Sequence, residues 1–114
     1  DDKFRVILDL GPASKGHALI LPKEHFADIY EIPEDLAGEV YKLAAKMAKK
    51  MTAALGCDGF NIVQNNKEVA GQTVFHFHMH LIPRYKDDNV NIGWSQGNLT
   101  EEIKAEILSG MNEE

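Results

Sequence analysis

The sequence contains one cysteine, Cys57, so no disulfide can form within the chain. No hydrophobic run approaches the roughly 20 residues that a membrane-spanning helix needs, and no signal-peptide pattern opens the chain. Acidic residues outnumber basic ones by 18 to 12, and a net charge of −6 argues against a protein that coats nucleic acid polymers or membranes. These absences favour a cytoplasmic protein. A small anionic ligand stays compatible, because backbone N–H groups and imidazoles can bind phosphate.

With 114 residues the chain fits a single domain, residues 1–114, with a real hydrophobic core. It begins at Asp1 and runs almost at once into an apolar segment, so we expect that a short N-terminal segment is missing. Apolar and β-branched runs predict strands over residues 4–8, 17–21, 59–64 and about 72–84.

Two segments carry helical periodicity. Apolar residues at spacings of three and four predict a long helix from about Pro33 to Leu55, which Gly56 ends. A short helix is expected from about Thr100, its cap, to Ser109. Three of its residues are expected to face inward: Ile103, Ile107 and Leu108. The order strand, strand, helix, strand, strand predicts an α+β domain with an antiparallel sheet.

Three of the five histidines alternate with Phe77 and Met79 in the segment His76-Phe77-His78-Met79-His80. Successive side chains of a strand point to opposite faces, so one strand would place all three imidazoles on the same side. Imidazole titrates closer to neutral pH than any other side chain. The segment therefore predicts a chemical site.

Three interpretations of these histidines are open. They could be polar residues on the solvent face of a half-buried strand. They could be metal ligands together with Asp9, His17 or His25, although no carboxylate lies in the segment itself. They could instead act on a phosphate, because neutral imidazole is a good nucleophile toward phosphorus and flanking imidazoles can donate hydrogen bonds. The third interpretation best explains several nitrogens beside a glycine-containing loop.

Four segments resemble motifs of the histidine triad (HIT) superfamily and follow one another along the chain in the same order as in that family. His76 to Ile82 resembles its His-φ-His-φ-His-φ-φ signature, and Gly16 to Lys23 with His25 resembles its Gly-His-x-Leu-x-x-Pro-Lys-x-His segment. Residues 61–65 resemble its third strand, and residues 70–74 its phosphate-side loop. The resemblance implies the HIT-like α+β fold, with an antiparallel sheet of about five strands, one long helix and a short C-terminal helix.

The resemblance also implies a nucleotidyl hydrolase or transferase that acts on the α-phosphate of nucleoside phosphate conjugates. His78 would attack the phosphate and form a nucleotidyl-histidine intermediate. His80 would contact the phosphate and the leaving group, while His17 and His76 would orient the triad. Asp9 matches the position that binds the ribose hydroxyls. Ile7 and Leu10 would line an apolar pocket for the base. Three polar residues would contact the phosphate or the leaving group: Asn65, Gln72 and Thr73.

No cofactor or catalytic metal is expected for this reaction, since imidazoles and N–H donors meet the charge at phosphorus. A structural zinc on His25 and His76 is expected only if a missing N-terminal segment supplies thiols. The family resemblance implies a homodimer in which the long helix and neighbouring strands of both subunits form a joint sheet. Two substrate classes stay open within the family: adenosine phosphoramidates, cleaved by its Hint-like branch, and dinucleoside polyphosphates, cleaved by its fragile-histidine-triad branch. Other classes of function are a nucleotide-binding scaffold with little turnover and a metal-dependent hydrolase.

Overall fold

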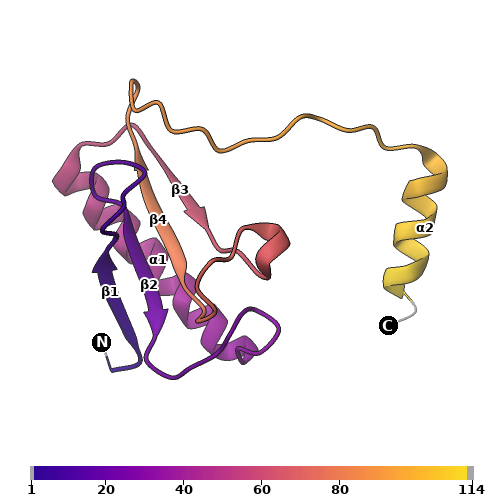
Figure 1. Ribbon diagram of the computed structural model, residues 1–114, viewed down its shortest axis with the longest axis horizontal. Coiled ribbons are helices and arrows are strands. Elements are labelled where there is room, and N and C mark those ends of the chain that lie inside the picture. The colour runs from indigo at the N-terminus through magenta and orange to yellow at the C-terminus, as the bar shows by residue number, and fades with distance from the viewer. Residues whose placement is uncertain (1, 113–114) are drawn as a thin grey trace.

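The computed structural model describes residues 2–112 and shows an antiparallel sheet with a long helix on one face (Figure 1). The strands lie in the order β1-β2-β4-β3. This confirms the α+β fold, with four strands in the sheet rather than about five. No helix in residues 2–112 is long and apolar enough to cross a membrane. The elements are β1 Phe4–Leu8, β2 Ala18–Pro22, α1 Glu34–Leu55, β3 Gly59–Val63, a 3₁₀ turn Glu68–Ala70, β4 Met79–Arg84 and α2 Glu101–Asn112.

Helix α1 begins and ends where its sequence predicts. Pro33 precedes its first turn with an extended backbone (ψ 143°), and Glu34 and Asp35 lie in that turn, where the helix dipole favours negative charge. Gly56 closes the helix in the left-handed conformation (φ 66°), and its N–H donates to the carbonyl of Thr52 at 2.9 Å.

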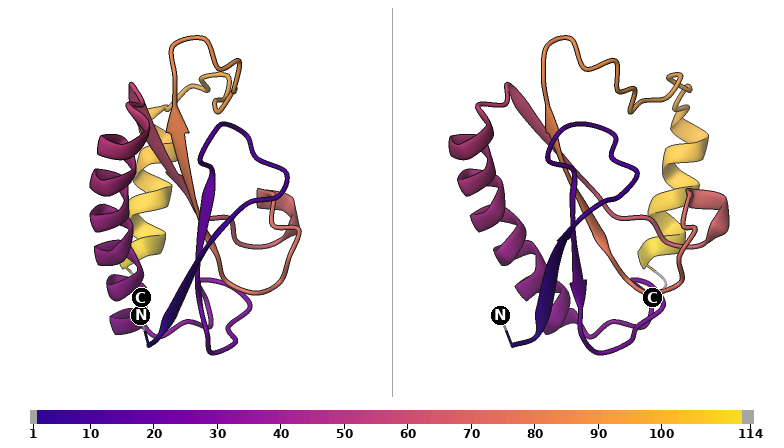
Figure 2. Two further views of the ribbon diagram at one scale, coloured as in Figure 1. Left: turned by 90° about the vertical axis from the view of Figure 1, so that its left-hand side faces the viewer. Right: turned by 60° about the vertical axis from the view of Figure 1, so that its left-hand side comes forward.

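The strand register divides the sheet into a covered face and an open face. Ile20, Met79 and Leu81 point toward α1 and pack with its buried residues Val40 and Ala44. The opposite face carries a row of paired residues, Ile7, Leu19, His80 and Val63, one from each strand. Helix α1 covers only one side of the sheet (Figure 2), so the His80 face stays available for a ligand.

Strand β4 is shorter than predicted. It begins at Met79, so His80 is the only triad histidine within a strand, and the expectation of one strand from about residue 72 is wrong. Contacts with distant residues replace the expected hydrogen bonds between strands. The Phe77 N–H donates to the carbonyl of Phe26 at 2.6 Å, and the His76 ring donates to the carbonyl of Pro22. The chain therefore bends through the first two histidines instead of alternating them across a sheet.

Helix α2 stands apart from the sheet at the end of an extended segment, residues 85–100 (Figure 1). Thr100 caps it as predicted, its Oγ1 accepting the Ile103 N–H at 3.1 Å. The expectation that Ile103, Ile107 and Leu108 face inward is wrong, because they are 43%, 50% and 49% exposed. Periodicity identified the apolar side of this helix, but it carries no information about what that side packs against.

Candidate active site

The loop between β1 and β2 carries His17 to the open face of the sheet. Asp9 and His17 close the loop through a 2.9 Å backbone bond, and the Asp9 Oδ1 accepts the Gly11 N–H at 2.9 Å. Gly16 adopts a φ of +92° and lies against Leu55 and Pro83, where a side chain would collide. The loop therefore fixes the His17 backbone immediately beside β4.

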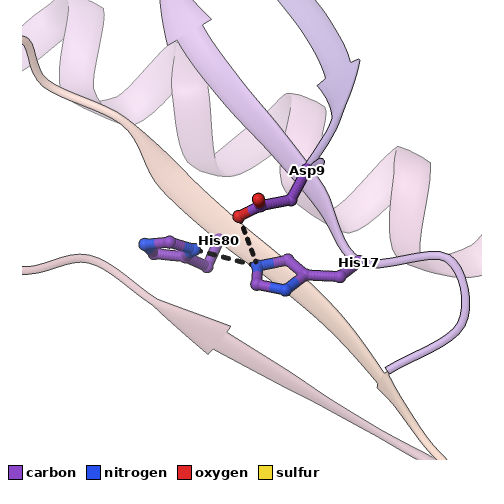
Figure 3. Close-up of side chains that lie close together, drawn as sticks. All are labelled: Asp9, His17 and His80. Atoms are coloured by element: carbon purple, nitrogen blue, oxygen red, sulfur yellow. Dashed lines mark hydrogen bonds and ion pairs between the residues drawn. The ribbon is translucent and has the colours of Figure 1, made fainter. Parts of the chain in front are cut away.

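His17 and His80 form a hydrogen bond whose direction follows from the backbone. The Ala13 N–H donates to the His17 Nδ1 at 2.9 Å, so neutral His17 carries its hydrogen on Nε2. That Nε2 lies 2.9 Å from the Nδ1 of His80 and 3.6 Å from the Oδ2 of Asp9 (Figure 3). His17 therefore donates to His80, and neutral His80 carries its own hydrogen on Nε2.

His78 presents the opposite tautomer. Its Nδ1 lies 2.8 Å from the carbonyl oxygen of His76, which can only accept, so Nδ1 carries the hydrogen. The Nε2 of His78 therefore holds an unshared lone pair, and the ring is half-buried. Its centroid lies 5.0 Å from that of His80. A nucleophilic nitrogen and an N–H donor thus lie side by side.

His76 and His25 form a second histidine pair. The Nε2 of His76 donates to the carbonyl of Pro22 at 2.8 Å, which leaves its Nδ1 to accept from the Nδ1 of His25 at 2.9 Å. His76 therefore ties the bend before β4 to the end of β2. Its backbone carbonyl and its ring both serve to position the triad.

Burial lowers the pKa of His80 below its usual value. The neighbouring rings of His78 and His17 lower this pKa further, and the carboxylate of Asp9 raises it. His80 is therefore neutral at neutral pH.

An apolar pocket of about 200 Å³ opens beside the histidines on the same face. Ile7 lines it, as expected for a base pocket, whereas Leu10 is fully exposed and is not among its lining residues. The prediction for Leu10 therefore finds no support in the structure. Sequence reasoning missed three lining residues, Leu19, Leu21 and Val74. Strand alternation could have identified Leu19 and Leu21, which share a face with Ile7, and Val74 is the last residue of the phosphate-side loop.

The polar residues predicted to contact phosphate occupy different environments. Gln72 is 2% exposed, and its side chain donates to the carbonyls of Ala27 and Val74 and accepts the Lys67 N–H. Both amide hydrogens of Gln72 are donated to backbone carbonyls, so the side chain holds the loop and has no N–H group left for a phosphate or a leaving group, contrary to the expectation. Thr73 is exposed and Asn65 half-buried, and their predicted roles stay predictions.

One cluster among residues 2–112 has the composition of a metal site. The nearest donor atoms of Asp9, His17 and His80 all lie within 4.8 Å of one another. A metal on the His17 Nε2 would require the hydrogen to move to Nδ1, where the Ala13 N–H already points. The cluster therefore suits a hydrogen-bonded chain better than a metal ion. The zinc expected on His25 and His76 with added thiols stays an expectation.

The chain is similar to known proteins both in sequence and in fold. A family model described as a HIT domain matches residues 1–87. The adenosine 5′-monophosphoramidase hnt1 of Schizosaccharomyces pombe is 40% identical over 100 residues, which cover 86% of this chain and 72% of that protein. An adenylylsulfatase of Arabidopsis thaliana is 39% identical over 88 residues, 77% of this chain and 45% of its own length. The crystal structure of a HIT family protein from Bacillus anthracis matches with a TM-score of 0.90 and 35% identity, covering 99% of this chain and 82% of that one.

Proposed function

The chain belongs to the HIT family, and from that membership we propose that it is a nucleotide hydrolase or transferase with a covalent nucleotidyl-His78 intermediate. Its substrates are nucleoside phosphate conjugates, attacked at the α-phosphate. The observation that carries the proposal is the tautomer of His78, whose Nδ1–H is tied to the carbonyl of His76 and whose Nε2 lone pair is free.

In the first step, the Nε2 of His78 forms a bond to phosphorus, and the bond from phosphorus to the leaving group breaks with its electron pair; an amine leaving group takes up one proton from solvent and departs as the neutral amine. The ring becomes cationic, and the carbonyl of His76 stabilises the charge through the Nδ1–H. In the second step, water attacks phosphorus and the P–N bond returns its electrons to Nε2. The products are a nucleoside monophosphate, a proton and the original enzyme.

His80 stabilises the charge on the transferring phosphoryl group. It is neutral and carries its hydrogen on Nε2, because its Nδ1 accepts from His17. A fixed donor in a partly buried site is worth more than the same donor in water. His76 and His17 hold this arrangement, and Thr73 and Asn65 supply further donors. The mechanism requires no metal or other cofactor.

The pocket and Asp9 supply the nucleoside contacts. Apolar residues on the open sheet face suit the flat surface of a base, and a carboxylate accepts from two vicinal hydroxyls of ribose. The two relatives' names describe different leaving groups on an adenosine monophosphate moiety, an amine and a sulfate. We therefore place adenosine phosphoramidates first among substrates to test, and dinucleoside polyphosphates second.

The test compares wild type with His78→Ala on a fluorescent adenosine phosphoramidate and on a dinucleoside polyphosphate. Wild type should release adenosine monophosphate, and the variant should lose this activity while unfolding at the same urea concentration. Equal slow turnover by both proteins would indicate a nucleotide-binding protein instead. Activity that a chelator abolishes and zinc or manganese restores would indicate a metal-dependent hydrolase.

We also propose that the chain forms a homodimer and that α2 contributes to its interface, in addition to the long helix and strands that the resemblance implies. The apolar side of α2, which includes Ile107 and Met111, is exposed at the end of an extended segment, where a second copy can bury it (Figure 1). Its acidic residues Glu101, Glu102 and Glu106 complement the lysines exposed on α1 of another copy. The matching Bacillus anthracis chain covers 99% of this one, so the match includes α2.

A further inference from the structure

Asp9, His17 and His80 form a chain that links the β1–β2 loop to β4 (Figure 3). The middle ring, His17, is only 6% exposed, and the side chain of Asp9 is 25% exposed. The Nε2 of His17 lies 2.9 Å from the His80 Nδ1 and 3.6 Å from the Asp9 Oδ2. One N–H group therefore faces two acceptors.

Two independent groups select the tautomer of His17. The Ala13 N–H points at Nδ1 and requires a lone pair there. The carboxylate of Asp9 points at Nε2 and favours a hydrogen there. The reversed tautomer would set one N–H against another on the loop side and a lone pair against a carboxylate on the other side. Both contacts would be repulsive.

We propose that Asp9 is a positioning residue for the chemical step: with the Ala13 N–H it holds His17 as an Nε2–H donor, and His17 thereby fixes His80 with its own Nε2–H turned toward the substrate phosphate. This inference rests on the proposed function of the site. It adds a role to the ribose contact that the family resemblance implies for Asp9.

The carboxylate of Asp9 is held in place before any nucleotide binds. Its Oδ1 accepts the Gly11 N–H at 2.9 Å, while its Oδ2 faces His17. Each oxygen has a second lone pair, so contact with ribose and contact with His17 are compatible. The groups that act on His80 are His78, His17 and Asp9, and Asp9 alone among them raises the pKa of His80.

The test separates the two roles of Asp9 by removing the ribose hydroxyls from the substrate. Wild type, Asp9→Asn and Asp9→Ala are assayed on adenosine 5′-phosphoramidate and on its 2′,3′-dideoxy analogue. If Asp9 only binds ribose, its replacement would raise KM for the first substrate and change neither KM nor kcat for the second. If Asp9 positions His17, its replacement lowers kcat on both substrates by about tenfold, because the carboxylate 3.6 Å from the His17 Nε2 no longer favours a hydrogen there. An unchanged kcat on the dideoxy substrate would overturn the inference.

Nitrogen NMR of the imidazoles provides a readout that does not depend on turnover. In wild type, His80 should show a protonated Nε2 and an accepting Nδ1. Asp9→Asn and His17→Ala should mix the two tautomers, and His17→Gln, which retains an N–H donor, should restore the wild-type pattern in part. Identical His80 spectra in wild type and Asp9→Asn would refute the role of Asp9. If wild type hydrolyses neither substrate, the proposed function fails, and the spectra still decide whether Asp9 positions His80.

Discussion

Gln72 offers a direct test of how the phosphate-side loop is built. Its buried side chain makes three hydrogen bonds to backbone groups, to the carbonyls of Ala27 at 2.7 Å and Val74 at 3.1 Å and to the N–H of Lys67 at 2.7 Å. Gln72→Leu keeps a similar volume but removes all three bonds. At about 1 kcal/mol for each bond, the free energy of unfolding should fall by about 3 kcal/mol.

Urea unfolding followed by circular dichroism measures this loss of free energy. In thermal unfolding, the same loss lowers Tm by about 12 °C, at about 4 °C for each kcal/mol in a domain of this size. Gln72→Glu is the matched variant, because it keeps an acceptor for the Lys67 N–H but places an oxygen against two carbonyls, so it should also be destabilised. If Gln72→Leu unfolds at the wild-type urea concentration and instead raises KM, Gln72 contacts substrate and the assignment is refuted.

Three further predictions address the loop, the triad and α2. Gly16→Ala should lose about 2 kcal/mol of unfolding free energy in urea titration, because its φ is +92° and a Cβ would lie 2.5 Å from Leu55 Cδ1; wild-type stability would contradict this. In NMR titration His80 should protonate below pH 6.5, and Asp9→Asn should lower its pKa further. Because the pKa of His80 is lower in the folded protein than in the unfolded chain, the unfolded chain binds a proton first as the pH falls. The free energy of unfolding should therefore fall as the pH drops through about 6.5. Ile107→Glu should shift the protein from dimer to monomer in light scattering, whereas Ser109→Glu on the polar side of α2 should not; a wild-type monomer would exclude the dimer.

The sequence predicted those features that local chemistry determines. Pro33 and Gly56 mark the ends of α1 because proline and glycine impose backbone angles wherever they stand. The cap at Thr100 is local in the same way. The sequence also indicated that His17, His78 and His80 lie together, because the family motifs carry them, whereas the pocket residues Leu19, Leu21 and Val74 were missed.

Features decided by distant contacts could not be predicted. The bend before Met79 depends on the carbonyl of Phe26, which lies 51 positions from its donor Phe77 in the 114-residue chain. The burial of Gln72 depends on its fit to the carbonyl of Ala27. The tautomer of His76 follows from the carbonyl of Pro22, 54 positions away. Those of His17 and His78 follow from nearby backbone groups of Ala13 and His76, whose directions are set by the folded loops and not by a residue pattern.

The covalent intermediate on His78 is the central claim, and rapid-quench mass spectrometry tests it most directly. Wild type is mixed with an adenosine phosphoramidate, quenched in denaturant at neutral to alkaline pH to preserve a P–N bond, and digested. The account predicts one adenosine monophosphate moiety on the peptide that contains His78, absent from His78→Ala. An adduct on a different residue, or single-turnover hydrolysis with no adduct at any quench time, would contradict it.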